Sequence, residues 1–140
     1  MTASTTSTQP SGVIAPYGGT LVDLMVPEAD RASVKASATT CLECSDRNAC
    51  DVELLIVGGF SPERGFMHQA DYAAVVEGHR TTSGHLFGLP IVMDTDREDV
   101  SVGDKVLLTY EGQELAVLTG EDKWEPDKVV EAKGCYGTTS

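Results

Sequence analysis

Apolar residues recur at helical spacing in three stretches of the first eighty residues. This spacing predicts helices over 27–38, 46–57 and 66–80, and the last has the most regular pattern. A proline at the first position of the first helix and Ser45, an N-cap residue before the second, are favourable start signals. A Gly-Gly pair marks the end of the second helix. Its final run, ELLIV, is also typical of a buried strand, but we favour the helix.

Strand-like patterns follow in the second half of the chain. The segment HLFGLPIVMD at 85–94 predicts a strand that a glycine and a proline interrupt, which is typical of an edge strand or a bulge. Two further strands are predicted at 105–110 and 114–120, and the Glu-Gly-Gln between them is a hairpin signal. Helices first and antiparallel strands afterwards predict an α+β domain around a small barrel or sheet.

The residues before the first helix divide into two parts. Residues 1–12 are rich in Ser and Thr, without a basic cluster or an apolar run, and we expect a disordered tail there rather than a secretory signal. Residues 13–27 are expected to be extended, with Leu21 and Val22 in the core. The length of 140 residues then predicts one domain over 13–140.

The charge balance restricts the classes of partner. Ten Lys and Arg stand against 22 Asp and Glu, so the formal net charge is −12. Such a field repels phosphate backbones and anionic lipid, which disfavours binding to nucleic acid or to a membrane surface. No apolar run approaches the roughly 18 residues of a membrane span. We expect a cytoplasmic protein, or a plastid protein if the tail is a targeting segment.

Three cysteines, Cys41, Cys44 and Cys50, raise the possibility of a metal or redox site. Cys41 and Cys44 form a CxxC motif, and the position of Cys44 beside the predicted N-cap would lower its thiol pKa. A zinc site needs a fourth ligand at suitable spacing. Incidental reduced thiols are therefore the favoured interpretation, because the remaining candidates are unsuitably spaced: His68, His79, His85 and Cys135.

The segment GGFSPERGFM, residues 58–67, has the glycine density of a phosphate-binding loop. A P-loop needs GxxxxGK followed by Ser or Thr, whereas five residues separate Gly59 from Gly65 here and Phe66 occupies the lysine position. A GxGxxG fingerprint is also absent. The favoured interpretation is a tight turn that links two helices.

The other candidate catalytic groups lack a supporting pattern. The carboxylates at 94–99 are typical of a solvated loop and do not have calcium-binding spacing. Ser61 lacks a GxSxG context, and His85 follows a glycine that indicates a turn. The residues alone therefore predict a soluble acidic α+β domain without a catalytic residue.

Five motifs nevertheless occur in an informative order. They are IAPYGG with LVDL at 14–24, CDVELL at 50–55, GGFSPERGFM at 58–67, GHLFGLPI at 84–91, and a last block at 124–139. This order resembles the N-terminal region of ATP sulfurylases (sulfate adenylyltransferases), where a signature GGFSPLxGFM follows a similar D-L-E-L-L. The resemblance covers nearly the whole chain. Tyr17 replaces the family's usual histidine, and Glu63 replaces an apolar residue.

The resemblance implies a PUA-like small β-barrel with flanking helices. In that fold the signature has a turn-and-packing role, so we expect these residues to be structural: Gly58, Gly59, Phe60, Ser61, Pro62, Gly65, Phe66 and Met67.

The family makes adenosine 5′-phosphosulfate and pyrophosphate from ATP and sulfate in a separate, following domain. That domain's Q-x-R-N-P-x-H and H-x-x-H motifs are absent here. The resemblance thus implies a truncated form, inactive alone, which needs no cofactor and has the catalytic domain, in cis or in trans, as its partner. Two alternatives remain: a standalone RNA-binding module, and a redox or metal module built on Cys41 and Cys44.

Overall fold

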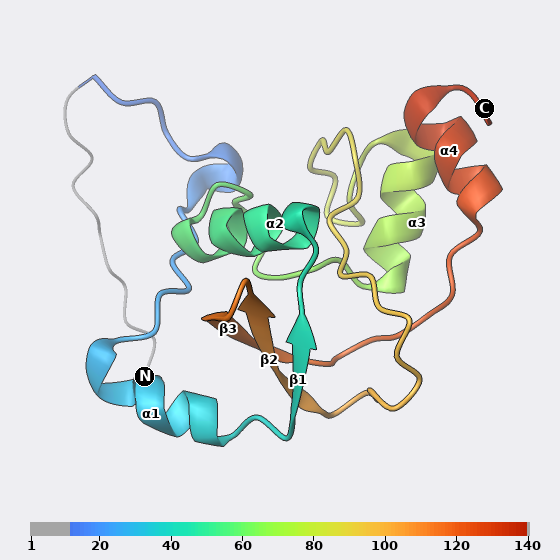
Figure 1. Ribbon diagram of the computed structural model, residues 1–140. Helices are drawn as coiled ribbons and strands as arrows, with labels where there is room; N and C mark the ends of the chain where they lie inside the picture. Colours follow the sequence, from blue (N-terminus) through green and yellow to red (C-terminus); the bar gives the residue numbers. More distant parts are fainter. Residues whose placement is uncertain (1–11, 140) are drawn as a thin grey trace.

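The computed structural model describes residues 12–139 and shows an α+β arrangement of helices around a small sheet (Figure 1). The tail expected at 1–12 falls almost entirely outside these residues. The elements in chain order are a 3-10 turn at Tyr17–Gly19, α1 (Glu28–Ala36), β1 (Thr40–Glu43), α2 (Asp46–Val57), α3 (Gln69–Gly78), β2 (Lys105–Tyr110), β3 (Gln113–Thr119) and α4 (Lys128–Tyr136).

The sheet has three strands in the order β1-β2-β3. β1 runs parallel to β2, whereas β2 and β3 form the predicted antiparallel hairpin with a two-residue turn. In the part of the chain that the structure describes, the sheet is open. The α+β class is thus confirmed, but the closed small barrel is wrong.

The strand predicted at 85–94 is wrong, because this segment forms only an isolated bridge between Arg80 and Leu86. Its backbone is held by single hydrogen bonds instead. The amide of Met67 donates to the carbonyl of Ile91, and the Asn48 side chain donates to the carbonyl of Val92. The glycine and proline in this segment remove the regularity that a strand ladder requires.

The helices follow their local signals. α2 has the predicted bounds: the Ser45 hydroxyl accepts from the amide of Asn48, and Gly58 caps the other end in the left-handed conformation. α1 is slightly shorter than predicted, with Pro27 as its N-cap. α3 begins only at Gln69, three residues later than predicted, where the carboxylate of Asp122 accepts from the helix's first amide.

Two elements were not predicted, β1 and α4. β1 has four residues and is defined by its pairing with β2, more than sixty positions away. α4 begins at Lys128, after Asp127, whose carboxylate accepts from the amides of Val129 and Val130. The expectation for the N-terminal segment was half right, because Val22 is buried but Leu21 is exposed.

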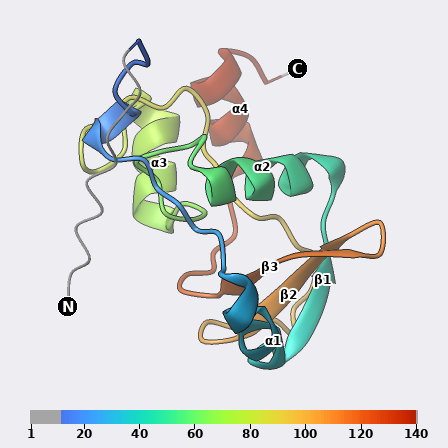
Figure 2. The ribbon, with the colours of Figure 1, turned by 90° about the vertical axis from the view of Figure 1, so that its left-hand side faces the viewer.

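Two hydrophobic clusters form the core. The first joins α3 to the extended 85–94 segment, and the second joins the sheet to α2, which lies across one face of the sheet (Figure 2). Phe66 packs against both clusters. The segment between α2 and α3 therefore connects the two halves of the core. The first cluster comprises Leu55, Met67, Tyr72, Val75, Val76, Ile91 and Val92, and the second comprises Leu42, Cys44, Ala49, Val52, Val106 and Leu108.

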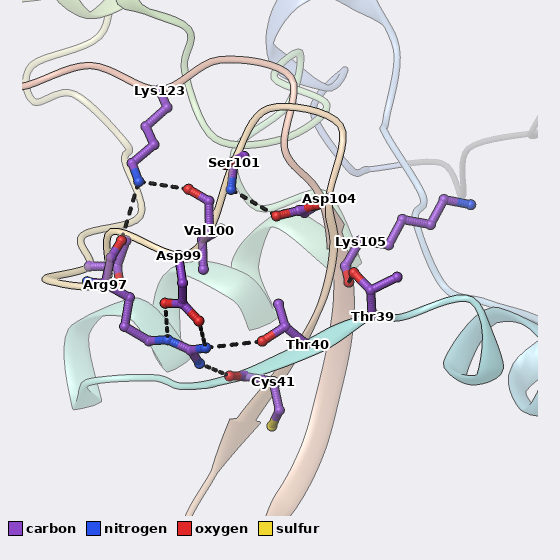
Figure 3. Close-up of polar contacts among 11 residues, drawn as sticks. Thr39, Thr40, Cys41, Arg97, Asp99, Val100, Ser101, Asp104, Lys105 and Lys123 are labelled. Carbon is purple, nitrogen blue, oxygen red and sulfur yellow. Dashed lines mark hydrogen bonds and ion pairs between the residues drawn. The ribbon is translucent and has the colours of Figure 1, made fainter.

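A polar network fastens the 94–104 loop to β1 (Figure 3). The Arg97 guanidinium forms two hydrogen bonds with the Asp99 carboxylate and donates to the Cys41 carbonyl and the Thr40 hydroxyl. Lys123 donates to the backbone carbonyls of Arg97 and Val100, so it ties the segment after β3 to the same loop. These contacts hold the acidic loop at 94–99 against the sheet edge.

Within residues 12–139, no helix is both long enough and apolar enough to cross a bilayer.

Candidate functional site

The signature segment 58–67 lies where α2 ends, the N-terminal segment passes and the two core clusters meet. Gly58 caps α2, and the amide of Gly59 donates back to the carbonyl of Leu54. The chain then turns at Ser61 and Pro62 before it enters the core at Phe66 and Met67. The segment is a joint between elements that are distant in the sequence.

Ser61 is the polar centre of this joint. Its buried hydroxyl donates to the carbonyl of Gly58 at 2.7 Å and accepts from the amide of Val22 at 2.9 Å. A second backbone bond, from the amide of Leu24 to the carbonyl of Ile56, fixes the same segment. Since buried polar groups require partners, this hydroxyl sets which residues of the N-terminal segment reach the core. It explains why Val22 is buried and Leu21 is not.

The glycines of the joint permit close approach of the N-terminal segment. A Cβ atom at Gly58 would collide with the carbonyl oxygen of Val22, and Gly58 has a φ of +83°. A Cβ at Gly18, which lies within the N-terminal segment, would come within 2.7 Å of Pro62. Two glycines on opposite sides of the contact are therefore required by packing, and Gly58 is required by conformation as well.

This geometry argues against a phosphate cradle. Such a cradle presents free backbone N–H groups to the ligand. Here the amides of Gly58, Gly59, Ser61 and Glu63 donate to carbonyls of the same region. The turn-and-packing interpretation of the segment is the one that its hydrogen bonds and burial support.

Tyr17, one of the two departures from the family motif, also acts in packing. Its phenolic oxygen accepts from the amide of Leu86 at 2.7 Å, and its ring contacts those of His85 and Phe87 edge-on. The other departure, Glu63, is half-buried, and this burial together with Asp71 raises the pKa of its carboxyl group. Tyr17 thus connects the N-terminal segment to the 85–94 segment.

The structure does not bring the three candidate cysteines together. Cys41 and Cys50 are exposed, on β1 and α2 respectively, and Cys44 is buried. The lowered pKa expected for Cys44 is wrong: burial raises the pKa of its thiol, with Glu43 and Cys41 adding to the effect. Within residues 12–139, no group of three or more His, Cys, Asp or Glu has metal-binding geometry.

These environments predict different thiol reactivities. Cys41 and Cys50 should react rapidly with a maleimide, because both thiols are exposed. Cys44 should react only as fast as the domain opens, because its thiol is buried and its thiolate form is disfavoured. A mass-spectrometric time course under native conditions measures each site. Labelling in denaturant is the control, where all sites should react. Native labelling of Cys44 as fast as Cys41 would contradict this assignment.

The histidines are separated too. His68 lies 3.0 Å from the Glu121 carboxylate, and the ring of His85 lies 2.9 Å from the Ser83 hydroxyl. The ring of His79 lies 3.3 Å from the carbonyl of Gly88. Each ring is engaged with its own neighbours, so no catalytic role is assigned to any of them.

Comparison with known proteins adds the family. A family model described as a PUA-like domain matches residues 14–140. The chain belongs to the PUA-like domain family. A similar solved structure is described as a hexameric APS kinase from Thiobacillus denitrificans. It has a TM-score of 0.71 and 34% sequence identity, and the match covers 81% of this chain and 24% of that one. The PUA-like α+β fold that the resemblance implies is therefore confirmed, although its sheet is not a closed barrel.

Curated relatives carry the name sulfate adenylyltransferase. The protein from Chaetomium globosum is 40% identical over 133 residues, and the one from Neurospora crassa is 42% identical over 132 residues. These matches cover 88% and 87% of this chain but 23% of each relative. The PUA-like domain thus spans about a quarter of the length of these relatives and corresponds to their N-terminal domain.

Proposed function

We propose that this PUA-like domain is the N-terminal, non-catalytic scaffold of a sulfate adenylyltransferase. The enzyme's reaction converts ATP and sulfate to adenosine 5′-phosphosulfate and pyrophosphate in sulfate assimilation. The observation that carries the proposal is the match of about 40% identity over nearly the whole chain to proteins of that name. In this proposal the domain supports the catalytic domain, in cis or in trans, and contributes no catalytic residue.

Two features of the site support a scaffold role. In the signature segment 58–67, the amides of Gly58, Gly59, Ser61, Glu63 and Met67 donate to backbone carbonyls, and the Ser61 hydroxyl is engaged as well. The net charge of −12 also opposes the binding of ATP and sulfate, both anions. Transition states of phosphoryl chemistry need clustered cationic donors. Neither feature suits a site for these substrates.

A pyrophosphate-release assay tests the proposal. The 140-residue chain, incubated with ATP, Mg²⁺ and sulfate, should release no pyrophosphate above a protein-free blank. The Chaetomium globosum sulfate adenylyltransferase is the positive control under identical conditions. Sulfate-dependent turnover by the chain alone would contradict the non-catalytic assignment.

A further inference from the structure

Helix α4 has two different faces. Glu131, Gly134 and Cys135 are turned toward the rest of the domain and are half-buried. Val129, Val130 and Tyr136 are turned away, with exposed fractions of 63%, 56% and 66%. Three large apolar side chains on one face of a nine-residue helix form an unusual surface for a monomeric domain. We call these three residues, with Lys133 between them, the α4 outer face.

The inner contacts of α4 fix how this face is presented. The backbone at Gly134 lies so close to the carbonyl of Val76 on α3 that a Cβ atom would collide with it. The Tyr72 hydroxyl, also on α3, donates to the Glu131 carboxylate. Both ribbon views show α4 at the periphery beside α3 (Figures 1 and 2). The helix is held firmly against α3, so its outer face has a defined orientation.

The charges around this face differ from those of the domain as a whole. Lys128 and Lys133 are exposed on α4. Of the carboxylates on and just before α4, Asp127 caps the helix, Glu131 on the inner face accepts from Tyr72, and Glu125 is exposed. In a chain of net charge −12, the α4 outer face therefore carries one cation, Lys133, among three apolar side chains. A complementary surface is apolar and bordered by carboxylates.

A second copy of this chain does not suit the face. A two-fold contact through α4 would place the same patch on both sides, so two lysines of like charge would enter one interface with no carboxylate from the patch to pair with them. Two bodies of net charge −12 would also repel each other. The relatives, in contrast, contain about three quarters of their length beyond the part that this chain matches.

We propose that the α4 outer face docks on the remaining part of the sulfate adenylyltransferase polypeptide, at an apolar surface bordered by carboxylates. The inference rests on the proposed function and adds to it the contact surface. Apolar side chains at the centre of an interface contribute most of its binding free energy, and Lys133 adds orientation and salt dependence.

The test uses the 140-residue chain and the Chaetomium globosum sulfate adenylyltransferase expressed without its matching residues, here called the remainder. Affinity is measured by calorimetry, and hydrogen exchange is followed at 128–136. Two variants change the face, Val130→Asp and Lys133→Glu. Two matched controls place the same changes at exposed positions elsewhere: Val102→Asp, where the side chain is 59% exposed, and Lys105→Glu.

We expect the unmodified chain to bind the remainder, more weakly as salt is raised, with slower exchange at 128–136. Val130→Asp and Lys133→Glu should each weaken binding by about tenfold or more, and the controls by less than about twofold. If the remainder shows no cooperative thermal transition, the same exchange measurement is made on a fusion of chain and remainder. Unchanged exchange at 128–136 in that fusion would overturn the inference.

The remaining outcomes separate the two proposals. Binding that all four variants leave intact would overturn the α4 inference while the proposed function stands. A folded remainder that does not bind the unmodified chain would count against the proposed function itself. Self-association of the chain that Val130→Asp abolishes would assign the face to a second copy and overturn the inference.

Discussion

Replacing Gly58 by alanine should destabilise the PUA-like domain by about 2–5 kcal/mol, which is a large part of the stability of a small domain. Gly58 has a φ of +83°, where a Cβ atom costs about 1–2 kcal/mol. The same atom would also collide with the carbonyl of Val22 and approach the Leu21 side chain to 2.8 Å, and such overpacking costs about 1–3 kcal/mol. Urea unfolding, followed by the fluorescence of the single tryptophan, Trp124, measures the loss.

Gly137 supplies the matched control. It also caps a helix, α4, with a φ of +70°, but within residues 12–139 a Cβ atom there would meet nothing closer than 4 Å apart from its chain neighbours. Gly137→Ala should therefore cost only the conformational part, about 1–2 kcal/mol. Equal losses in the two variants would show that the contact with Val22 does not determine the cost at Gly58.

The elements that sequence patterns predicted correctly are those with local signals at both ends. α2 has a serine N-cap and a glycine C-cap, and both act as expected. The β2–β3 hairpin has a two-residue turn of Glu111 and Gly112, and both adopt positive φ. In each case the conformation of the terminal residues is decided by side chains within a few positions, so the sequence contains the required information.

The wrong predictions concern segments whose structure depends on residues that are distant in the sequence. β1 is a strand because β2 pairs with it from more than sixty positions away. The 85–94 segment has the composition of a strand, but its carbonyls at Ile91 and Val92 accept from Met67 and Asn48 instead of from a neighbouring strand. Alternation alone also could not decide whether Leu21 or Val22 is buried, because that register depends on Ser61.

At the candidate site, too, the local features could be predicted from the sequence, whereas the distant contacts could not. Motif order marked residues 58–67 as important, and their local chemistry indicated a turn. The partners of the turn, Val22 through Ser61 and Gly18 against Pro62, lie about forty positions away and follow from the fold alone. The α4 outer face had no sequence signal, because a helical valine pair with a tyrosine six positions later is as typical of a core as of a surface.

The second large effect is expected at Asn48, which is 3% exposed within α2. Its amide nitrogen donates to the carbonyl of Val92, and its amide oxygen accepts from the Ser45 hydroxyl. Asn48→Asp keeps the shape but places a carboxylate oxygen against the carbonyl oxygen of Val92. An uncompensated buried charge costs about 3–5 kcal/mol, so this variant should be close to unfolded at about pH 7. The urea midpoint of unfolding is the measurement.

The pH dependence distinguishes charge from lost packing. Burial disfavours the carboxylate, so the pKa of the introduced carboxyl group is raised in the folded state above its unfolded value of about 3.9. The destabilisation by this carboxylate is therefore complete above the folded pKa. It disappears below the unfolded pKa, where the protonated group can donate to the Val92 carbonyl again.

Asn48→Ala, which loses the same donor without gaining a charge, should cost about 1–3 kcal/mol. As the pH is lowered from about 7 to about 5, the urea midpoint of Asn48→Asp should rise relative to that of Asn48→Ala. A constant difference between the two variants would mean that no charge is buried at this position.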